Sequence, residues 1–338
     1  MDNQDYSNAI PFIMFDQTHG FILNKEAETY LSQLNPDRKL GIISIVGKYR
    51  TGKSFFINRV LLERNSNQKG FQVGPTINPC TKGLWIWKKE LKSLEDDNMD
   101  ILLIDTEGFG GMDENLNHDS RIFLFSLLLS SYFIYNSQGS IDENALNNLS
   151  LIINLAKDIQ IKSKNNTNED AADYFPAFLW VVRDFALQIV DQQGNKLSQK
   201  DYLEKALELQ KGVSDAVDQK NRIRRQMKHY FKDRDCQTLV RPVESEKDLQ
   251  NLNQITNEEL RPEFLDQINF LRKKIFKKIK PKILNGQSLN GQMLVQICKS
   301  YIDAINNGGL PNIENAWNYV KKMKDKKLSK NLLIHQNI

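Results

Sequence analysis

A phosphate-binding pattern constrains the fold of this chain more than any other feature of its sequence. Residues 47–54 read GKYRTGKS and fit the pattern G-x-x-x-x-G-K-[ST] at every fixed position. Residues 40–46 before it are apolar and rich in β-branched side chains, which is typical of a buried strand in a parallel sheet. Residues 55–62 after it carry enough apolar positions to bury one face of a helix. This strand–loop–helix order predicts a P-loop rather than a chance match.

Each part of the P-loop, residues 47–54, has its own role toward a nucleoside triphosphate. Gly47 and Gly52 let the backbone turn tightly and approach a ligand closely. The backbone N–H groups then point at the phosphates, next to the positive end of a helix. Lys53 can reach the β- and γ-phosphates and act in catalysis, and the Ser54 hydroxyl can bind Mg²⁺. The other residues expected to contact the phosphates are Lys48, Tyr49, Arg50 and Thr51.

A second motif lies at a suitable distance after the P-loop. Residues 99–108 read MDILLIDTEG, an apolar strand that ends in Asp105. An aspartate at this position holds Mg²⁺ in P-loop enzymes, and we expect Asp105 to do so through water. Gly108 can offer its backbone N–H to the γ-phosphate, and we expect Thr106 and Phe109 beside the nucleotide. Alone, the segment also fits a buried strand that ends in a polar turn, but its pairing with the P-loop favours the metal site.

A third apolar run, residues 178–182, predicts another buried strand, which ends at Arg183 and Asp184. Strands that alternate with helices predict an α/β fold with a mostly parallel sheet and helices on both faces. Ligands of such sheets bind at the carboxyl ends of the strands, so we expect the P-loop, Asp105 and Asp184 to meet there. The longest apolar stretch, residues 122–134, is too short to span a bilayer and predicts a buried helix against the sheet.

These motifs alone leave the base undecided. Small GTPases read guanine with an N-K-x-D segment, which this sequence lacks. The carboxylate of Asp184 can accept hydrogen bonds from two N–H groups on the edge of guanine, whereas adenine offers no such pair. However, Arg-Asp dipeptides are also common surface ion pairs. On the residues alone, an ATP-using phosphotransferase therefore stays open.

Four separated segments together resemble the guanylate-binding proteins, large GTPases of the dynamin superfamily with a GB1/RHD3-type G domain. They are the P-loop, residues 80–87 (CTKGLWIW), residues 105–108 (DTEG) and residues 183–185 (RDF), in this order. Residues 129–137 and 311–317 are also similar to the family, and the resemblance covers about residues 8–325. It implies a large G domain that hydrolyses GTP with Mg²⁺ to GDP or GMP and that forms homodimers when nucleotide is bound.

The resemblance also implies roles for individual residues. Arg50 matches an arginine finger, which neutralises charge on the transferred phosphoryl group. Thr81 matches a switch threonine that closes over Mg²⁺ and the γ-phosphate, and Glu107 matches a residue that organises the attacking water. Asp184 matches the residue that reads guanine. Further residues expected at the nucleotide are Val73, Gly74, Pro75, Arg183 and Arg241, the last in a loop that covers the base and meets a second subunit.

Two departures from the family pattern change the expectations. Pro79 stands where the family commonly has a serine that helps position water, and proline has neither a hydroxyl nor an N–H group. A GTP-binding switch with little or no turnover is therefore the alternative to an active GTPase. The long helical stalk is nearly absent: Gly308 and Gly309 predict a break, and Asn312 can cap the next helix. We expect a G domain over residues 1–306 and the start of a truncated stalk over residues 307–338.

Composition limits the partners. The 338 residues include 46 Lys and Arg and 42 Asp and Glu, and the net charge of +4 does not itself indicate nucleic acid. Basic runs at residues 222–228 and 272–282 fit an anionic surface or solvated helix faces, and the sparse aromatic residues favour the latter. Three widely spaced cysteines fit a reducing compartment. We expect a cytoplasmic protein without a nucleic-acid partner, and peripheral attachment to internal membranes stays open.

Overall fold

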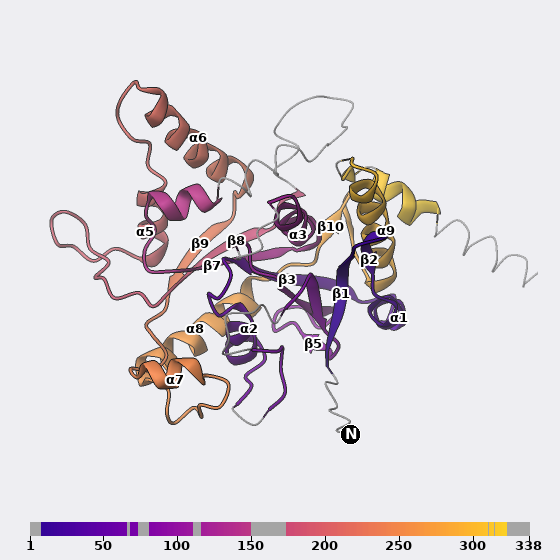
Figure 1. Cartoon of the computed structure of the whole chain (residues 1–338), viewed down its shortest axis with the longest axis horizontal. Helices are drawn as coiled ribbons and strands as arrows, with labels where there is room; N and C mark the ends of the chain where they lie inside the picture. The colour runs from indigo at the N-terminus through magenta and orange to yellow at the C-terminus, as the bar shows by residue number, and fades with distance from the viewer. Residues whose placement is uncertain are drawn as a thin grey trace, which may run out of the picture.

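A mixed β-sheet of nine strands forms the centre of the described part of the chain, taken from a computed structural model (Figure 1). The structure describes residues 8–65, 68–73, 81–110, 116–149, 174–309, 311–313 and 315–322. The strand order is β2-β1-β4-β6-β3-β7-β8-β9, and β5 pairs with β6. The strands are β1 (Ala9–Asp16), β2 (Gly20–Leu23), β3 (Lys39–Gly47), β4 (Leu84–Trp87), β5 (Leu91–Lys92), β6 (Met99–Thr106), β7 (Tyr132–Gln138), β8 (Ala177–Arg183) and β9 (Arg234–Thr238).

The sheet has a parallel part and an antiparallel edge. Strands β6, β3, β7, β8 and β9 run parallel, and β4, β1 and β2 continue the sheet in antiparallel order. The predicted mostly parallel sheet is confirmed, and the antiparallel hairpin of β1 and β2 extends it on one side. Because the central strands are parallel, the carboxyl ends of β3, β6, β7 and β8 lie at the same edge of the sheet.

Helices cover both faces of the sheet, as predicted. Alternate side chains of the central strands belong to two separate hydrophobic clusters, one with α1, α3 and α9 and one with α2 and α8. None of the helices in the described ranges has the length and apolar character needed to cross a bilayer. The helices are α1 (Lys25–Gln33), α2 (Lys53–Phe56) with the π-helical turn η1 (Ile57–Leu61), α3 (Leu116–Leu129), α5 (Gln199–Ala206), α6 (Asp215–Tyr230), α7 (Glu246–Gln250), α8 (Pro262–Lys278) and α9 (Gly291–Asn306). A short hairpin, β10 (Ile283–Leu284) and β11 (Gln287–Ser288), precedes α9.

The apolar stretch at residues 122–134 forms two elements, so the prediction of one buried helix is wrong for its second part. Helix α3 ends at Leu129 and strand β7 begins at Tyr132. Between them, the N–H of Ser131 donates to the carbonyl of Ile42 and starts the pairing with β3. Successive side chains of β7 face the two opposite hydrophobic clusters. A strand that is buried on both faces is apolar at every position, and its sequence therefore looks like that of a buried helix.

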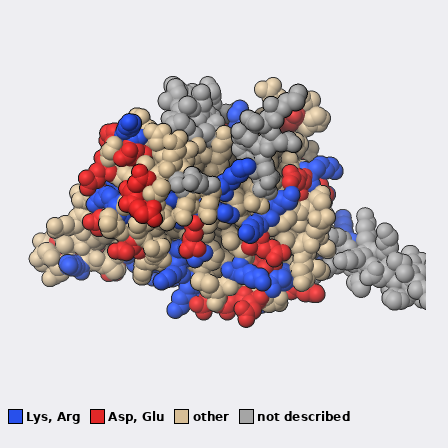
Figure 2. Space-filling model, turned by 90° about the horizontal axis from the view of Figure 1, so that it is seen from below, with Lys and Arg blue, Asp and Glu red and all other residues tan. Residues whose placement is uncertain are grey.

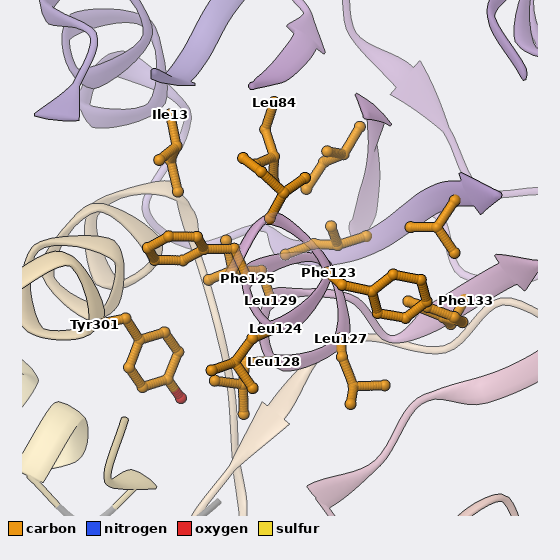
Figure 3. Close-up of a cluster of buried hydrophobic side chains, with 14 of the residues drawn as sticks. Ile13, Leu84, Phe123, Leu124, Phe125, Leu127, Leu128, Leu129, Phe133 and Tyr301 are labelled. Carbon is orange, nitrogen blue, oxygen red and sulfur yellow. The ribbon is translucent and has the colours of Figure 1, made fainter. Parts of the chain in front are cut away.

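Helix α3 lies between the sheet and α9 (Figure 3). Its Phe123 faces Phe133 of β7, with 5.4 Å between the ring centroids. On another side of the helix, Leu124 and Leu128 lie toward Tyr301 of α9 (Figure 3). Burial of each such side chain contributes about 1.5–3 kcal/mol. This packing fixes α3 and α9 as one layer on the sheet face opposite α2.

Several cations of the basic run at residues 272–282 form contacts within the fold. On α8, Lys274 and Lys278 form ion pairs of 3.0 and 2.6 Å with the buried carboxylate of Asp235 on β9. Lys282 is buried as well. Figure 2 shows positive and negative side chains interspersed over the face that it displays. The prediction of solvated helix faces therefore holds for exposed cations such as Lys273 and Lys277, but not for the ion-paired and buried lysines of this run.

The end of α9 is fixed to the edge of the sheet. Asn306, its last residue, accepts a hydrogen bond of 2.9 Å from the N–H of Phe21 and donates one of 2.8 Å to the carbonyl of the same residue in β2. After the break, the Asn312 side chain accepts a hydrogen bond of 2.9 Å from the N–H of Asn315, which confirms the predicted helix cap. This helix is described from residue 315 to residue 322.

Candidate functional site

A cavity of about 420 Å³ opens at the carboxyl ends of β3, β6, β7 and β8. The loop after β3 and the start of α2 form one part of its wall, and α7 with the residues that follow it forms another. Twelve of the residues predicted from the sequence line this cavity: Tyr49, Arg50, Thr51, Gly52, Lys53, Ser54, Val73, Thr81, Thr106, Gly108, Arg183 and Asp184. Segments that are far apart in the sequence therefore meet at one place, as the parallel sheet predicts.

The P-loop backbone takes the tight course that its glycines allow. Gly52, just before α2, has a φ of +77°, in the left-handed region that favours glycine. A Cβ atom at Gly47 would lie 2.1 Å from the carbonyl oxygen of Asn136 on β7, so only glycine fits beside that strand. Arg50 is also left-handed, with a φ of +63°, which is uncommon for a residue with a side chain. This conformation puts the exposed arginine at the cavity.

Lys53 is a buried cation at the base of the cavity. Its Nζ donates a hydrogen bond of 3.2 Å to the carbonyl of Lys48. Burial lowers the pKa of Lys53 to about 8, although Asp105 and Glu107 act to raise it. Gly108 lies against the ammonium group, because a Cβ atom there would come within 2.7 Å of Nζ. A phosphate beside Lys53 would favour its charged form and offset the cost of burial.

Three oxygen-bearing side chains converge next to Lys53. The Ser54 hydroxyl donates to Oδ2 of Asp105 at 2.6 Å, the Thr81 hydroxyl donates to the same oxygen at 3.3 Å, and the two hydroxyls are 3.5 Å apart. Burial raises the pKa of Asp105 to about 6, against the effect of these hydrogen bonds and of Lys53. Two hydroxyls and a carboxylate are hard oxygen ligands, the kind that Mg²⁺ prefers. The three residues predicted to hold the metal therefore lie together and suit that ion.

The side chain of Glu107 lies away from the cavity wall. Its Oε2 accepts hydrogen bonds from the N–H of Gly83 at 2.9 Å and from Nε2 of His118 at 3.1 Å. Burial acts to raise the pKa of Glu107, but the hydrogen bonds from His118 and Gly83 outweigh it and the pKa is lowered. The structure thus holds an ionised Glu107 between the start of β4 and α3, and not among the residues that line the cavity.

The side chain of Phe109 also lies outside the cavity wall, although the sequence predicts this residue beside the nucleotide. Its ring is partly buried and packs against the hydrophobic core, 6.0 Å from the ring of Phe123 and 6.5 Å from that of Tyr135. Its backbone remains close to the P-loop, because its carbonyl accepts a hydrogen bond of 2.9 Å from the N–H of Tyr49. An apolar ring next to an apolar core has little reason to turn toward a polar cavity. Phe109 thus supports the loop through its backbone.

Arg183, the last residue of β8, and Asp184, which follows it, form another part of the wall. Asp184 has a φ of +55°, and its Oδ2 accepts a hydrogen bond of 2.9 Å from Nε2 of Gln138. Its Oδ1 is buried and has no hydrogen-bond partner among the described residues. Arg183 is buried between the rings of Phe55 and Phe264, with Cζ 5.6 and 6.0 Å from their centroids. Burial lowers the pKa of this guanidinium, while the carboxylate of Asp184 acts to raise it.

The remaining predicted residues have other positions. Arg241 is not part of the cavity wall. It forms an ion pair of 2.6 Å with Glu246, which is part of the wall. Gly47, Lys48 and Asp105 are not among the residues of the wall, but each lies next to P-loop residues that are. Gly74 and Pro75 lie outside the described residues, as does Pro79.

Comparison with known proteins identifies the family. The model of the guanylate-binding protein N-terminal domain matches residues 18–284 of this chain. The chain belongs to the guanylate-binding protein family. The model of the guanylate-binding protein C-terminal domain matches residues 285–327. The resemblance that the sequence motifs indicate is therefore confirmed.

Individual guanylate-binding proteins match over most of this chain. It is 36% identical over 314 residues to guanylate-binding protein 1 of Chlorocebus aethiops and 35% identical over 308 residues to human guanylate-binding protein 4. These alignments cover 90% and 89% of this chain, but 52% and 47% of the two relatives. The chain thus spans about half the length of the curated relatives that it matches.

Several residues at the cavity of this guanylate-binding protein were not predicted. Gln138 is the last residue of a strand next to the P-loop strand, and this position alone could have indicated it. Nothing in the sequence of residues 246–253 indicates a ligand site, because this segment reaches the cavity only through the tertiary fold. His118, which holds Glu107, has no motif around it in the sequence that indicates this contact. The unpredicted residues of the wall are Phe55, Gln72, Gln138, Glu246, Leu249, Gln250, Leu252 and Asn253.

Proposed function

We propose that this chain binds GTP together with Mg²⁺ and hydrolyses it to GDP. One observation carries the proposal: a buried lysine, a group of three metal-type oxygen ligands and an unsatisfied carboxylate meet at one cavity. The first two suit a triphosphate and its metal, and the third suits the N–H groups of guanine. Membership of a family whose relatives are named for guanylate binding supports guanine over adenine.

The binding roles follow from the positions of the side chains. The P-loop N–H groups and Lys53 hold the phosphates. Ser54, Thr81 and Asp105 would hold Mg²⁺, which when bound supplies positive charge to the phosphate oxygens. Asp184 accepts hydrogen bonds from the base. In this arrangement the nucleotide lies along the cavity, between the P-loop and the segment at residues 246–253.

Hydrolysis is assigned to residues next to the phosphate end. Arg50 is exposed, lines the cavity and lies three residues before Lys53, so its guanidinium can reach the outer phosphate. A guanidinium there stabilises charge that develops on the transferred phosphoryl group and accelerates GTP hydrolysis by about 10³–10⁵-fold in other GTPases. Glu107 would orient the attacking water after its carboxylate leaves His118. Whether GMP is a further product is decided by the product analysis below.

A GTP-binding switch with little turnover is a second candidate, and one observation favours it. The Glu107 carboxylate binds Gly83 and His118 and does not line the cavity. While these two hydrogen bonds hold the carboxylate, it is not free to orient a water molecule at the γ-phosphate. The sequence adds to this, because Pro79 stands where the family commonly has a serine and proline has no hydroxyl.

We further propose that the protein acts as a nucleotide-dependent homodimer in the cytoplasm. A second subunit over the cavity would exclude water and order the exposed Arg50, which strengthens its electrostatic effect. The ion pair of Arg241 with Glu246, a residue of the cavity wall, supports a base-covering role for the loop that contains Arg241. Peripheral attachment to internal membranes would use exposed cations such as Lys273 and Lys277 of α8, and nucleic acid is not a proposed partner.

The test is chromatography of the products formed from GTP at several protein concentrations. A rate of GDP formation per protein molecule that rises with protein concentration supports the dimeric GTPase. Tight GTP binding without product identifies the switch, and equal use of ATP contradicts the guanine assignment. Arg50→Ala should lower the single-turnover rate at least about 100-fold with little change in GTP affinity. Arg222→Ala, an exposed arginine of α6, is the matched control.

A further inference from the structure

Gln138 lies beside Asp184 at the wall of the cavity. It is the last residue of β7 and pairs with Arg183 of the parallel strand β8, so the backbone fixes its position relative to Asp184. Its side chain is exposed to solvent, lines the cavity and donates a hydrogen bond of 2.9 Å from Nε2 to Oδ2 of Asp184. An exposed polar group at the edge of a cavity is available to a ligand.

The carboxylate of Asp184 determines which way the Gln138 amide points. An ionised carboxylate only accepts hydrogen bonds, so the NH₂ group of Gln138 must face it, and a flipped amide would place two acceptors against each other. The NH₂ group has two hydrogens, and Asp184 takes one of them. The other can be donated to a ligand. Asp184 itself keeps acceptor capacity, because its Oδ1 is buried without a partner among the residues that the structure describes.

With the buried Oδ1 of Asp184 turned toward a bound base, the two side chains would present two acceptors followed by a donor. The edge of guanine carries the complementary pattern: the N2 amine and N1–H donate, and the adjacent O6 accepts. The edge of adenine has an acceptor at N1 and a donor at N6, so it opposes the pattern at both positions. Asp184 alone supplies the two acceptors, and Gln138 supplies the donor that completes the match.

The geometry points to Gln138 as a specificity-determining residue that donates its second amide hydrogen to O6 of the base while Asp184 accepts from N1 and N2. This inference rests on the proposed binding of GTP. It adds a second reader of the base, located on β7 and separate from the Arg-Asp segment after β8. Its energetic effect is that of one neutral hydrogen bond, a change of about 3- to 10-fold in affinity.

The test compares GTP with 6-thioguanosine triphosphate, in which a weakly accepting sulfur replaces O6. Gln138→Met keeps the length of the side chain and removes the amide. Because Gln138 is exposed, we expect the variant to fold normally, which thermal unfolding checks. We expect Gln138→Met to bind GTP about 3- to 10-fold more weakly, and to lose the preference of the native protein for GTP over the thio analogue. Gln193→Met, at an exposed glutamine of the loop before α5, should leave both affinities unchanged.

An unchanged ratio of the two affinities in Gln138→Met would overturn the inference, since equal weakening of both nucleotides means that Gln138 only supports Asp184. A separate variant isolates the proposed function. Asp184→Asn should weaken GTP binding and favour xanthosine triphosphate, whose O2 can accept from the new amide. If Asp184→Asn shows this change and Gln138→Met keeps the ratio, the inference alone fails. If Asp184→Asn changes neither affinity, the guanine assignment fails as well.

Discussion

Lys282 is a buried lysine outside the cavity wall whose effect on stability depends on pH. Its Nζ donates hydrogen bonds to the carbonyls of Ser130 at 2.8 Å and Tyr174 at 3.2 Å, and burial lowers its pKa from 10.5 to about 7. Below pH 7 the folded and unfolded chains both bind the proton. Between about pH 7 and pH 10.5 the unfolded chain holds the proton and the folded chain does not. The contribution of Lys282 to the free energy of unfolding therefore rises with pH across this window.

The size of this effect follows from the two pKa values. Each pKa unit corresponds to about 1.4 kcal/mol, so the whole window corresponds to at most about 5 kcal/mol, and the step from pH 7 to pH 9 to about 2 kcal/mol. Lys282→Met removes the titrating group and keeps a long side chain. It also leaves two carbonyls without a donor, which lowers the free energy of unfolding by about 1 kcal/mol for each carbonyl at either pH. Between pH 7 and pH 9, the free energy of unfolding of the variant should thus fall by about 2 kcal/mol relative to that of the native protein.

The assay is urea unfolding at both pH values, followed by fluorescence of the four tryptophans. Other groups that titrate in this range, such as Lys53 and the buried tyrosines, are present in both proteins and cancel in the difference. Lys196→Met, at an exposed lysine, is the control and should differ from the native protein by the same amount at both pH values. The reasoning is refuted if the free energy of unfolding of Lys282→Met also differs from that of the native protein by the same amount at both pH values.

Three further variants test other contacts. Gly47→Ala places a Cβ atom 2.1 Å from the Asn136 carbonyl oxygen, and should destabilise the fold by about 1–3 kcal/mol and abolish the thermal stabilisation by GTP. His118→Ala should raise the single-turnover rate several-fold at unchanged GTP affinity, because Glu107 is released toward the cavity; a slower rate would show that His118 holds Glu107 in its working position. Asp235→Asn removes the carboxylate that pairs with Lys274 and Lys278, and should lower the free energy of unfolding by about 3–5 kcal/mol at neutral pH. Because the pKa of Asp235 is lowered, this difference should shrink as the pH falls below about 4 in acid-unfolding curves.

The sequence was sufficient to predict which motifs would meet. The P-loop, Asp105 and Asp184 each follow a strand that reads as buried, and parallel strands bring their carboxyl ends to one edge of a sheet. The distance of 2.6 Å between Ser54 and Asp105 follows from this rule, because Asp105 lies near the end of β6 and Ser54 lies at the start of α2, which the P-loop joins to the adjacent strand β3. Local sequence and sheet topology together therefore fix this part of the site.

The directions of side chains could not be predicted in the same way. Glu107 turns to His118 and Phe109 turns into the core, although the backbone of both lies next to the P-loop. Which of two possible partners a side chain takes depends on residues contributed by α3, and no local pattern reports that. The same holds for residues 122–134, where full burial gives a helix and a strand the same apolar sequence.

The two hydrogen bonds between Asn306 and Phe21 join residues that are 285 positions apart in the sequence. They have a mechanical consequence. Besides the packing of α9 in the hydrophobic core, they tie its C-terminal end to β2, the antiparallel edge strand of the sheet. We expect a pull on the chain beyond α9 to act on this edge strand, whereas the strands that carry the P-loop and Asp105 lie farther inside the sheet.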